Sequence, residues 1–166
     1  MVTTVGTEAH VVDLLSDLIH LDFDAADAYQ AAIDQIKNQQ FAATLRAFKH
    51  DHLQHVAELS SILSGMGHEP PQELDMKSLL TRGKVIIGSL AGDGAILAAM
   101  RSNEIDTNTA YERAVAHGGL DDVMRDVLQR GCRTSVAIPN GSYPQSKLCE
   151  VQRKRSLLVD GSVPVL

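Results

Sequence analysis

Apolar residues recur every three or four positions from about residue 10 to residue 131, which is the spacing of one buried helical face. The pattern predicts four helices, over about residues 10–36, 41–66 and 76–117 and from about residue 120 onward. The long interval between the second and third stretches indicates a crossing loop. The predicted fold class is therefore all-α, an antiparallel four-helix bundle with one long crossover.

Glycine, proline and threonine mark the predicted helix ends. Gly67 follows the last apolar residue of the second stretch, and Pro70 and Pro71 prevent its continuation. Thr4 or Thr7 is predicted to cap the first helix. Several glycines weaken the first half of the third stretch, where we expect the helix to break.

Helical periodicity stops after about Gly131. Residues 131–166 carry three of the five prolines, both cysteines and no histidine. We therefore expect an N-terminal tail over residues 1–8, a helical bundle over residues 9–131 and an irregular tail over residues 132–166. The fourth helix would then be truncated, and the apolar seams that face it would be exposed. This exposure predicts a homodimer.

Composition narrows the class of protein. A net charge of −6 disfavours nucleic acids and anionic membranes as partners. The first ten residues lack a basic start and an apolar run, and the most apolar stretch, residues 85–100, is too short to span a bilayer and contains Asp93. We therefore expect a cytoplasmic protein. Cys132 and Cys149 form no metal-binding or redox motif.

Titratable residues interrupt the apolar seams near the middle of three predicted helices. The first seam passes through Asp22, the second through His52 and His55, and the third through Glu104. Asp51 lies one position off the second seam and could also turn inward. Because an unpaired buried charge is costly, such groups are expected to share metal ions or protons. A buried histidine is more often hydrogen-bonded to a neighbour than metal-bound, and this alternative stays open.

An acid and a tyrosine repeat at the same spacing in two of these helices. Asp22 precedes Tyr29 by seven residues, and Glu104 precedes Tyr111 by seven. Seven residues is about two helical turns, so each pair lies on one helix face. The repeat predicts a pseudo-symmetric site. The ordinary alternative is that both tyrosines are core aromatics with a bonded hydroxyl.

Together these motifs resemble the ferritin-like, rubrerythrin-like superfamily, and more closely bacterial ferritin-like proteins of unassigned function. The resemblance covers about residues 11–128. It is carried by LIHLDFDAADAY from Leu18, by DHLQHVAEL from Asp51, and by AILAAM from Ala95 through YERA ending at Ala114. It implies a ferritin-like bundle that holds two iron or manganese ions, with a single acid from each of two helices and a Glu-x-x-His motif from each of the other two.

The resemblance implies a role for each matching residue. Asp22 and Glu104 would be the single-acid ligands, His55 would be the histidine of the first Glu-x-x-His motif, and both tyrosines would hydrogen-bond to ligands. This chain departs from the pattern because His52 occupies the glutamate position. Either His52 ligates, or Asp51 substitutes, or this half of the site is degraded. The second motif is absent from the fourth helix, so the site is incomplete, with enough ligands for one metal ion but not for an efficient dimetal site.

A shifted reading frame would explain the missing motif. Tyr29 and His55 are 26 residues apart, so the repeat places the second histidine near residue 137. Back-translating residues 131–142 with GC-rich codons and reading from the third base yields Glu-Arg-Arg-His, with the histidine at position 138. We therefore predict a frameshift near Gly131, whereas the alternative is that this protein evolved a different tail. The DNA sequence distinguishes them.

Two classes of function remain. The first is a metal-dependent oxidoreductase or iron-handling protein, in which oxygen or peroxide is activated or Fe(II) is oxidised; no catalytic residue is assigned. The second is a non-catalytic helical bundle, such as a stress or interaction protein, whose site is vestigial. An inactive product of a damaged gene is a third possibility.

Overall fold

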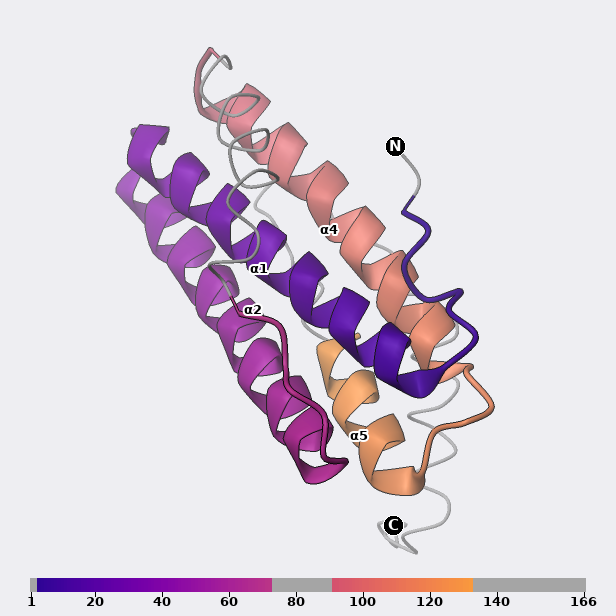
Figure 1. The fold of residues 1–166 in the computed structure, drawn as a ribbon. Helices are drawn as coiled ribbons and strands as arrows, with labels where there is room; N and C mark the ends of the chain where they lie inside the picture. The colour runs from indigo at the N-terminus through magenta and orange to yellow at the C-terminus, as the bar shows by residue number, and fades with distance from the viewer. Residues whose placement is uncertain (1–2, 73–90, 133–166) are drawn as a thin grey trace, which may run out of the picture.

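The computed structural model of the chain describes residues 3–72 and 91–132, and over these residues it contains helices and no strands (Figure 1). The helices are α1 (Val11–Gln35), α2 (Gln39–Gly65), α4 (Asp93–Val115) and α5 (Asp122–Gly131). Prediction and structure agree on the first two helices to within about two residues. The predicted helical residues 76–90 and the irregular tail beyond residue 132 lie outside the described residues.

The helix ends follow local hydrogen bonding. At the end of α2, Gly67 has a φ of +80°, and its N–H donates to the Ser64 carbonyl at 3.0 Å while that of His68 donates to the Leu63 carbonyl at 3.0 Å. This is the Schellman ending that the Gly67 position predicted. Asn38 caps α2 by accepting from two backbone N–H groups.

The predicted threonine cap of α1 is wrong. The N-cap of α1 is His10, and its side chain makes no capping hydrogen bond. Thr7 donates its hydroxyl to the carbonyl of Thr4 at 2.8 Å instead. The preceding segment lies against α4, because Arg113 donates to the carbonyl of Thr3 and a Cβ at Gly6 would clash with Arg113.

Contacts at two levels fix the direction of α4. At one end, the Asp93 carboxylate accepts from the backbone N–H groups of Lys37 and Asn38, both at 2.9 Å. About four to five turns further along each helix, Tyr111 of α4 contacts Asp22 of α1. As α1 residue numbers fall, those of α4 rise, so the two helices are antiparallel.

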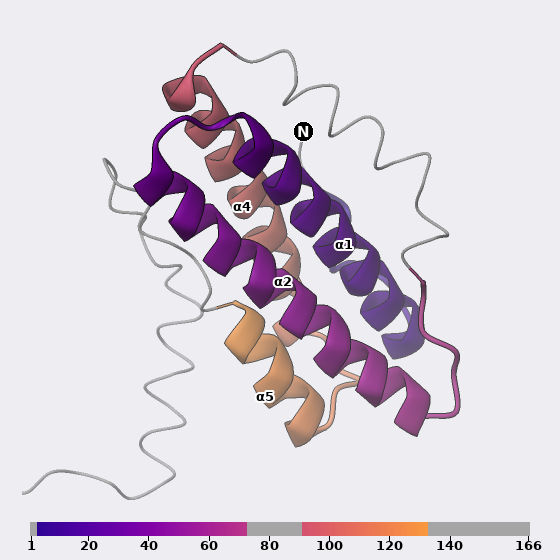
Figure 2. The same cartoon turned by 90° about the vertical axis from the view of Figure 1, so that its left-hand side faces the viewer.

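The same reasoning places α2. The Lys49 ammonium of α2 donates to Gln30 of α1 at 2.8 Å, and His52 contacts Asp22, so α2 also runs antiparallel to α1. Consequently α2 and α4 run parallel to each other, and α2 ends at the opposite end of the bundle from where α4 begins (Figures 1 and 2).

The core divides into two apolar clusters. One cluster is covered by α5 and includes Leu18, Leu59 and Leu128, all fully buried. The other lies toward the α1–α2 turn and draws only on α1, α2 and α4, with Ile96 and Met100 among its members. Each fully buried aliphatic side chain contributes about 1.5–3 kcal/mol to folding. A polar layer separates the two clusters.

No described helix combines the length and the apolar character that crossing a membrane requires.

Candidate metal centre

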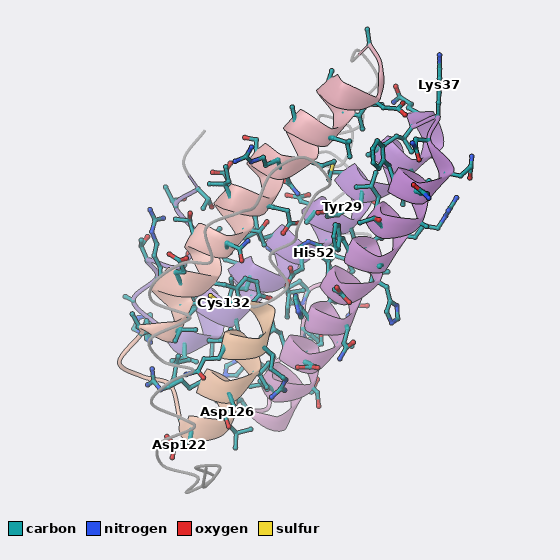
Figure 3. All side chains as sticks on the ribbon, turned by 180° about the vertical axis from the view of Figure 1, so that it is seen from behind. Tyr29, Lys37, His52, Asp122, Asp126 and Cys132 are labelled. Carbon is teal, nitrogen blue, oxygen red and sulfur yellow. The ribbon has the colours of Figure 1, made fainter. Side chains whose placement is uncertain are left out.

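The polar layer is built from three helices. Asp22 comes from α1, His52 and His55 from α2, and Glu104 from α4. The exposed fractions are 0% for Asp22, 2% for His52, 9% for His55 and 6% for Glu104, so water is nearly excluded from all four. The structure therefore brings together the four residues that interrupt the apolar seams in the sequence. Figure 3 shows His52 between the helices, beside Tyr29.

His52 connects the two carboxylates. Its Nδ1 lies 2.8 Å from Asp22 Oδ1, and its Nε2 lies 3.0 Å from Glu104 Oε1. Burial alone would lower the pKa of His52, but the hydrogen bonds to both carboxylates outweigh it and raise that pKa to about 10. At neutral pH the ring is therefore an imidazolium in which both nitrogens donate. Burial would likewise raise the pKa of Asp22, but the hydrogen bond from His52 and the nearby His55 ring lower it.

The two tyrosines bond to the acid of the other helix. Tyr29 of α1 donates its hydroxyl to Glu104 Oε1 of α4 at 2.5 Å, and Tyr111 of α4 donates to Asp22 Oδ2 of α1 at 2.5 Å. Burial and then the adjacent carboxylate raise the pKa of each tyrosine above its ordinary value. Both phenols are therefore protonated donors. The tyrosine of each repeat therefore bonds to the acid of the other repeat, across α1 and α4.

Four rings form a row through the layer. The ring centroids of Tyr29 and His52 are 5.5 Å apart, those of His52 and His55 are 6.0 Å apart, and those of His55 and Tyr111 are 5.6 Å apart. These spacings restrict the rotation of both imidazoles. The donor atoms are consequently held in place by packing as well as by hydrogen bonds.

The donor set fits a single metal ion. One ligand atom from each of Asp22, His52 and His55 lies within 4.8 Å of the others. Two atoms bound to one ion at about 2.1 Å are about 3.0–3.4 Å apart in octahedral or tetrahedral geometry. Asp22 Oδ1 lies 2.8 Å from His52 Nδ1 and 3.8 Å from His55 Nδ1, which brackets that range. Two imidazoles and a carboxylate suit iron, manganese or zinc.

Asp51 does not belong to this group of three. It is partly exposed, one position before His52 on α2. Its charge is nevertheless close enough to help raise the pKa of Tyr29, after burial and the two effects of Glu104. Ligation by Asp51 therefore stays a prediction. The predicted second Glu-x-x-His motif, at residues 135–138 of the other frame, lies outside the described residues.

Two residues beside the centre were not predicted from the sequence. Glu58 is partly buried and follows His55 by three residues. The regular spacing of His52, His55 and Glu58 could therefore have indicated that Glu58 lies near the centre. Gly131 of α5 packs on the ring of Tyr111, where a Cβ would lie 2.4 Å from Cε1. No sequence signal marks that contact, because it depends on how α5 docks.

Comparison with known proteins identifies a family without assigning an activity. No curated protein and no solved structure matches the chain. The family described as Domain of unknown function (DUF2383) matches residues 10–117, which include α1, α2, α4 and all four residues of the polar layer. The chain therefore belongs to the DUF2383 family.

Proposed function

We propose that this protein is a ferritin-like metal-binding protein that holds one iron or manganese ion between α1, α2 and α4. The observation that carries the proposal is the buried group of Asp22, His52 and His55, whose ligand atoms lie within 4.8 Å of one another. Glu104 would join the set only after the His52 ring turns, because its Oε1 lies 3.0 Å from Nε2, whereas Asp22 contacts Nδ1 of that ring. Carboxylates suit hard cations and imidazole suits iron.

The helix arrangement supports the ferritin-like part of the proposal. The helices α2 and α4 are parallel, so the chain between the end of α2 and the start of α4 has to cross the length of the bundle. This agrees with a bundle that has one long crossover. The acid–tyrosine pairs also relate α1 to α4 as two similar halves. The absence of a second Glu-x-x-His motif from the described residues favours one ion rather than two.

The metal ion and the residues around it would have different roles at the site. A bound iron or manganese ion would supply Lewis-acid and redox chemistry toward oxygen, peroxide or Fe(II). Tyr29 and Tyr111 hold one oxygen each of Glu104 and Asp22, which orients the remaining lone pairs. His52 would give up a proton to become a ligand, and the surrounding apolar clusters exclude water.

Metal analysis of the purified protein tests this proposal. The protein is loaded anaerobically with Fe(II), or with Mn(II), and passed through a desalting column before the metal is counted. We expect about one ion per chain, and loss of that ion in Asp22→Asn and in Glu104→Ala. His50→Ala is the matched control, because His50 is exposed on the same helix. A metal-free protein after loading would contradict the proposal.

A second candidate function rests on His52. Because its two nitrogens already satisfy both carboxylates, the polar layer is a closed network without a metal ion. This favours a non-catalytic bundle, for example a stress or interaction protein with a vestigial site. Thermal unfolding distinguishes the two candidates. A metal-binding protein loses stability in chelator after loading, whereas a vestigial site gives the same melting temperature with and without metal.

A further inference from the structure

The buried centre meets the surface at His55. The side chain of His55 is 11% exposed, whereas those of His52 and Asp22 are 3% and 0% exposed. A cation that reaches Asp22 from solvent therefore has the least protein to pass on the His55 side. On that side α5 lies beside α2 (Figure 2).

Glu58 carries a negative charge one helical turn beyond this exposed edge of His55. It follows His55 by three residues on α2, so the two side chains share a helix face. Its charge helps raise the pKa of Tyr111, and the His55 ring helps lower the pKa of Glu58. The spacing of one helical turn places Glu58 beside His55 on α2. A hydrogen bond from Gln54 is the main cause of the lowered pKa of Glu58.

Two exchangeable donors hold the Glu58 carboxylate. Gln54 donates to Oε1 at 3.0 Å, and Arg130 of α5 donates to Oε2 at 2.9 Å. The Arg130 and Glu58 side chains are 53% and 26% exposed, so water screens this pair and makes it weak. A divalent cation could therefore replace Arg130 at Glu58 without unfolding α5.

We propose that Glu58 is an outer binding position for divalent metal ions, from which an ion passes by His55 to the buried centre, and that Arg130 competes with the ion for Glu58. This inference rests on the proposed metal binding. It assigns Glu58 a role in the rate of loading rather than in the final ligand set. A negative charge at an opening raises the local cation concentration and the association rate.

Stopped-flow loading with Co(II), followed by its visible absorption, tests the inference on the full chain. Glu58→Gln should slow association by roughly tenfold while the final amount of bound Co(II) is unchanged. Arg130→Gln should speed association, because it frees the carboxylate and removes a positive charge. Glu69→Gln is the matched control. It removes the same charge from an exposed residue that lies beyond the end of α2.

The outcomes separate the two proposals. An association rate of Glu58→Gln within twofold of the unsubstituted protein, with Co(II) bound normally, overturns the role of Glu58 alone. An equal slowing by Glu69→Gln also overturns it, because the effect would then be one of net charge. If the unsubstituted protein binds no Co(II), both proposals fail.

Discussion

Tyr29 of α1 donates its hydroxyl to Glu104 of α4 at 2.5 Å, while both side chains are buried. Asp22, the acid two turns before Tyr29 on its own helix, is bonded instead by Tyr111. The two bonds therefore cross between α1 and α4 and tie the helices together at the polar layer. Asp22 accepts from Tyr111 at Oδ2 and from His52 at Oδ1, whereas Oε1 of Glu104 accepts from both Tyr29 and His52.

Removing either phenol should destabilise the bundle. Tyr29→Phe and Tyr111→Phe each delete a hydrogen bond to a buried carboxylate, which is worth about 1.5–3 kcal/mol. Urea unfolding measures the loss. The Phe variants keep the ring, so the apolar packing is matched. A loss below about 0.5 kcal/mol in both variants would show that these bonds do not support the layer.

Removing the imidazolium should cost more than removing a phenol. His52→Ala leaves Asp22 and Glu104 buried without the cation between them, and breaking a buried pair in this way costs about 3–5 kcal/mol. His50→Ala removes an exposed histidine of the same helix and should change the free energy of unfolding by less than about 0.5 kcal/mol. Equal effects of the two substitutions would refute the bridging role of His52.

Substituting glutamate for His52, as the proposed ferritin-like site would have at this position, should make folding depend on metal. His52→Glu creates Glu-x-x-His with His55 and replaces a cation with a third carboxylate in the layer. We expect this variant to melt lower than the unsubstituted protein in chelator and to gain more from Fe(II) or Mn(II). Thermal melts with and without metal measure both effects. A variant that melts equally in chelator and in metal would contradict this prediction.

Two glycines should respond in opposite directions to alanine. Gly94→Ala adds a Cβ that meets no atom within 4 Å, so it should stabilise α4 by about 0.5–1 kcal/mol. Gly131→Ala places a Cβ 2.4 Å from Cε1 of Tyr111 and should destabilise the protein by about 1–3 kcal/mol. The comparison is made by urea unfolding. A gain of stability in Gly131→Ala would mean that α5 does not dock on Tyr111.

Asp24 makes stability depend on pH. Burial and then the nearby charge of Asp27 raise the pKa of Asp24 from 3.8 to about 6. Since the folded-state pKa is raised, the stabilisation is present below pH 4 and is lost as pH rises through 6. Asp24→Asn should therefore raise the free energy of unfolding by on the order of 1 kcal/mol at pH 7 and leave it unchanged near pH 3.5. The value at pH 7 is discounted for the partial exposure of Asp24. An equal gain in stability at both pH values would show that the raised pKa of Asp24 is not its cause.

The sequence predicted which residues form the polar layer better than it predicted the hydrogen bonds between them. Following each seam in steps of three and four found Asp22, His52, His55 and Glu104, because a helical period dictates which positions face inward. The crossed bonds of Tyr29 were not predictable from spacing, since they depend on the antiparallel register of α1 and α4.

Other features depend on the local environment. The sequence places Glu58 one helical turn after His55, but only the docking of α5 shows that Arg130 bonds to Glu58. The threonine cap failed because the Thr7 hydroxyl donates to the Thr4 carbonyl, and His10 stands at the N-cap of α1. Asp51 was a reasonable candidate by sequence, yet one helical position places it outside the group of three.

Anomalous diffraction from crystals soaked in Mn(II) or Fe(II) tests the central claim most directly. Our account predicts one peak per chain, within about 2.0–2.3 Å of a carboxylate oxygen of Asp22 and of ring nitrogens of His52 and His55. It also predicts that His52 no longer bridges Asp22 and Glu104 as an imidazolium. Absence of a peak there, with both His52 hydrogen bonds intact, would contradict a metal centre and favour the closed network.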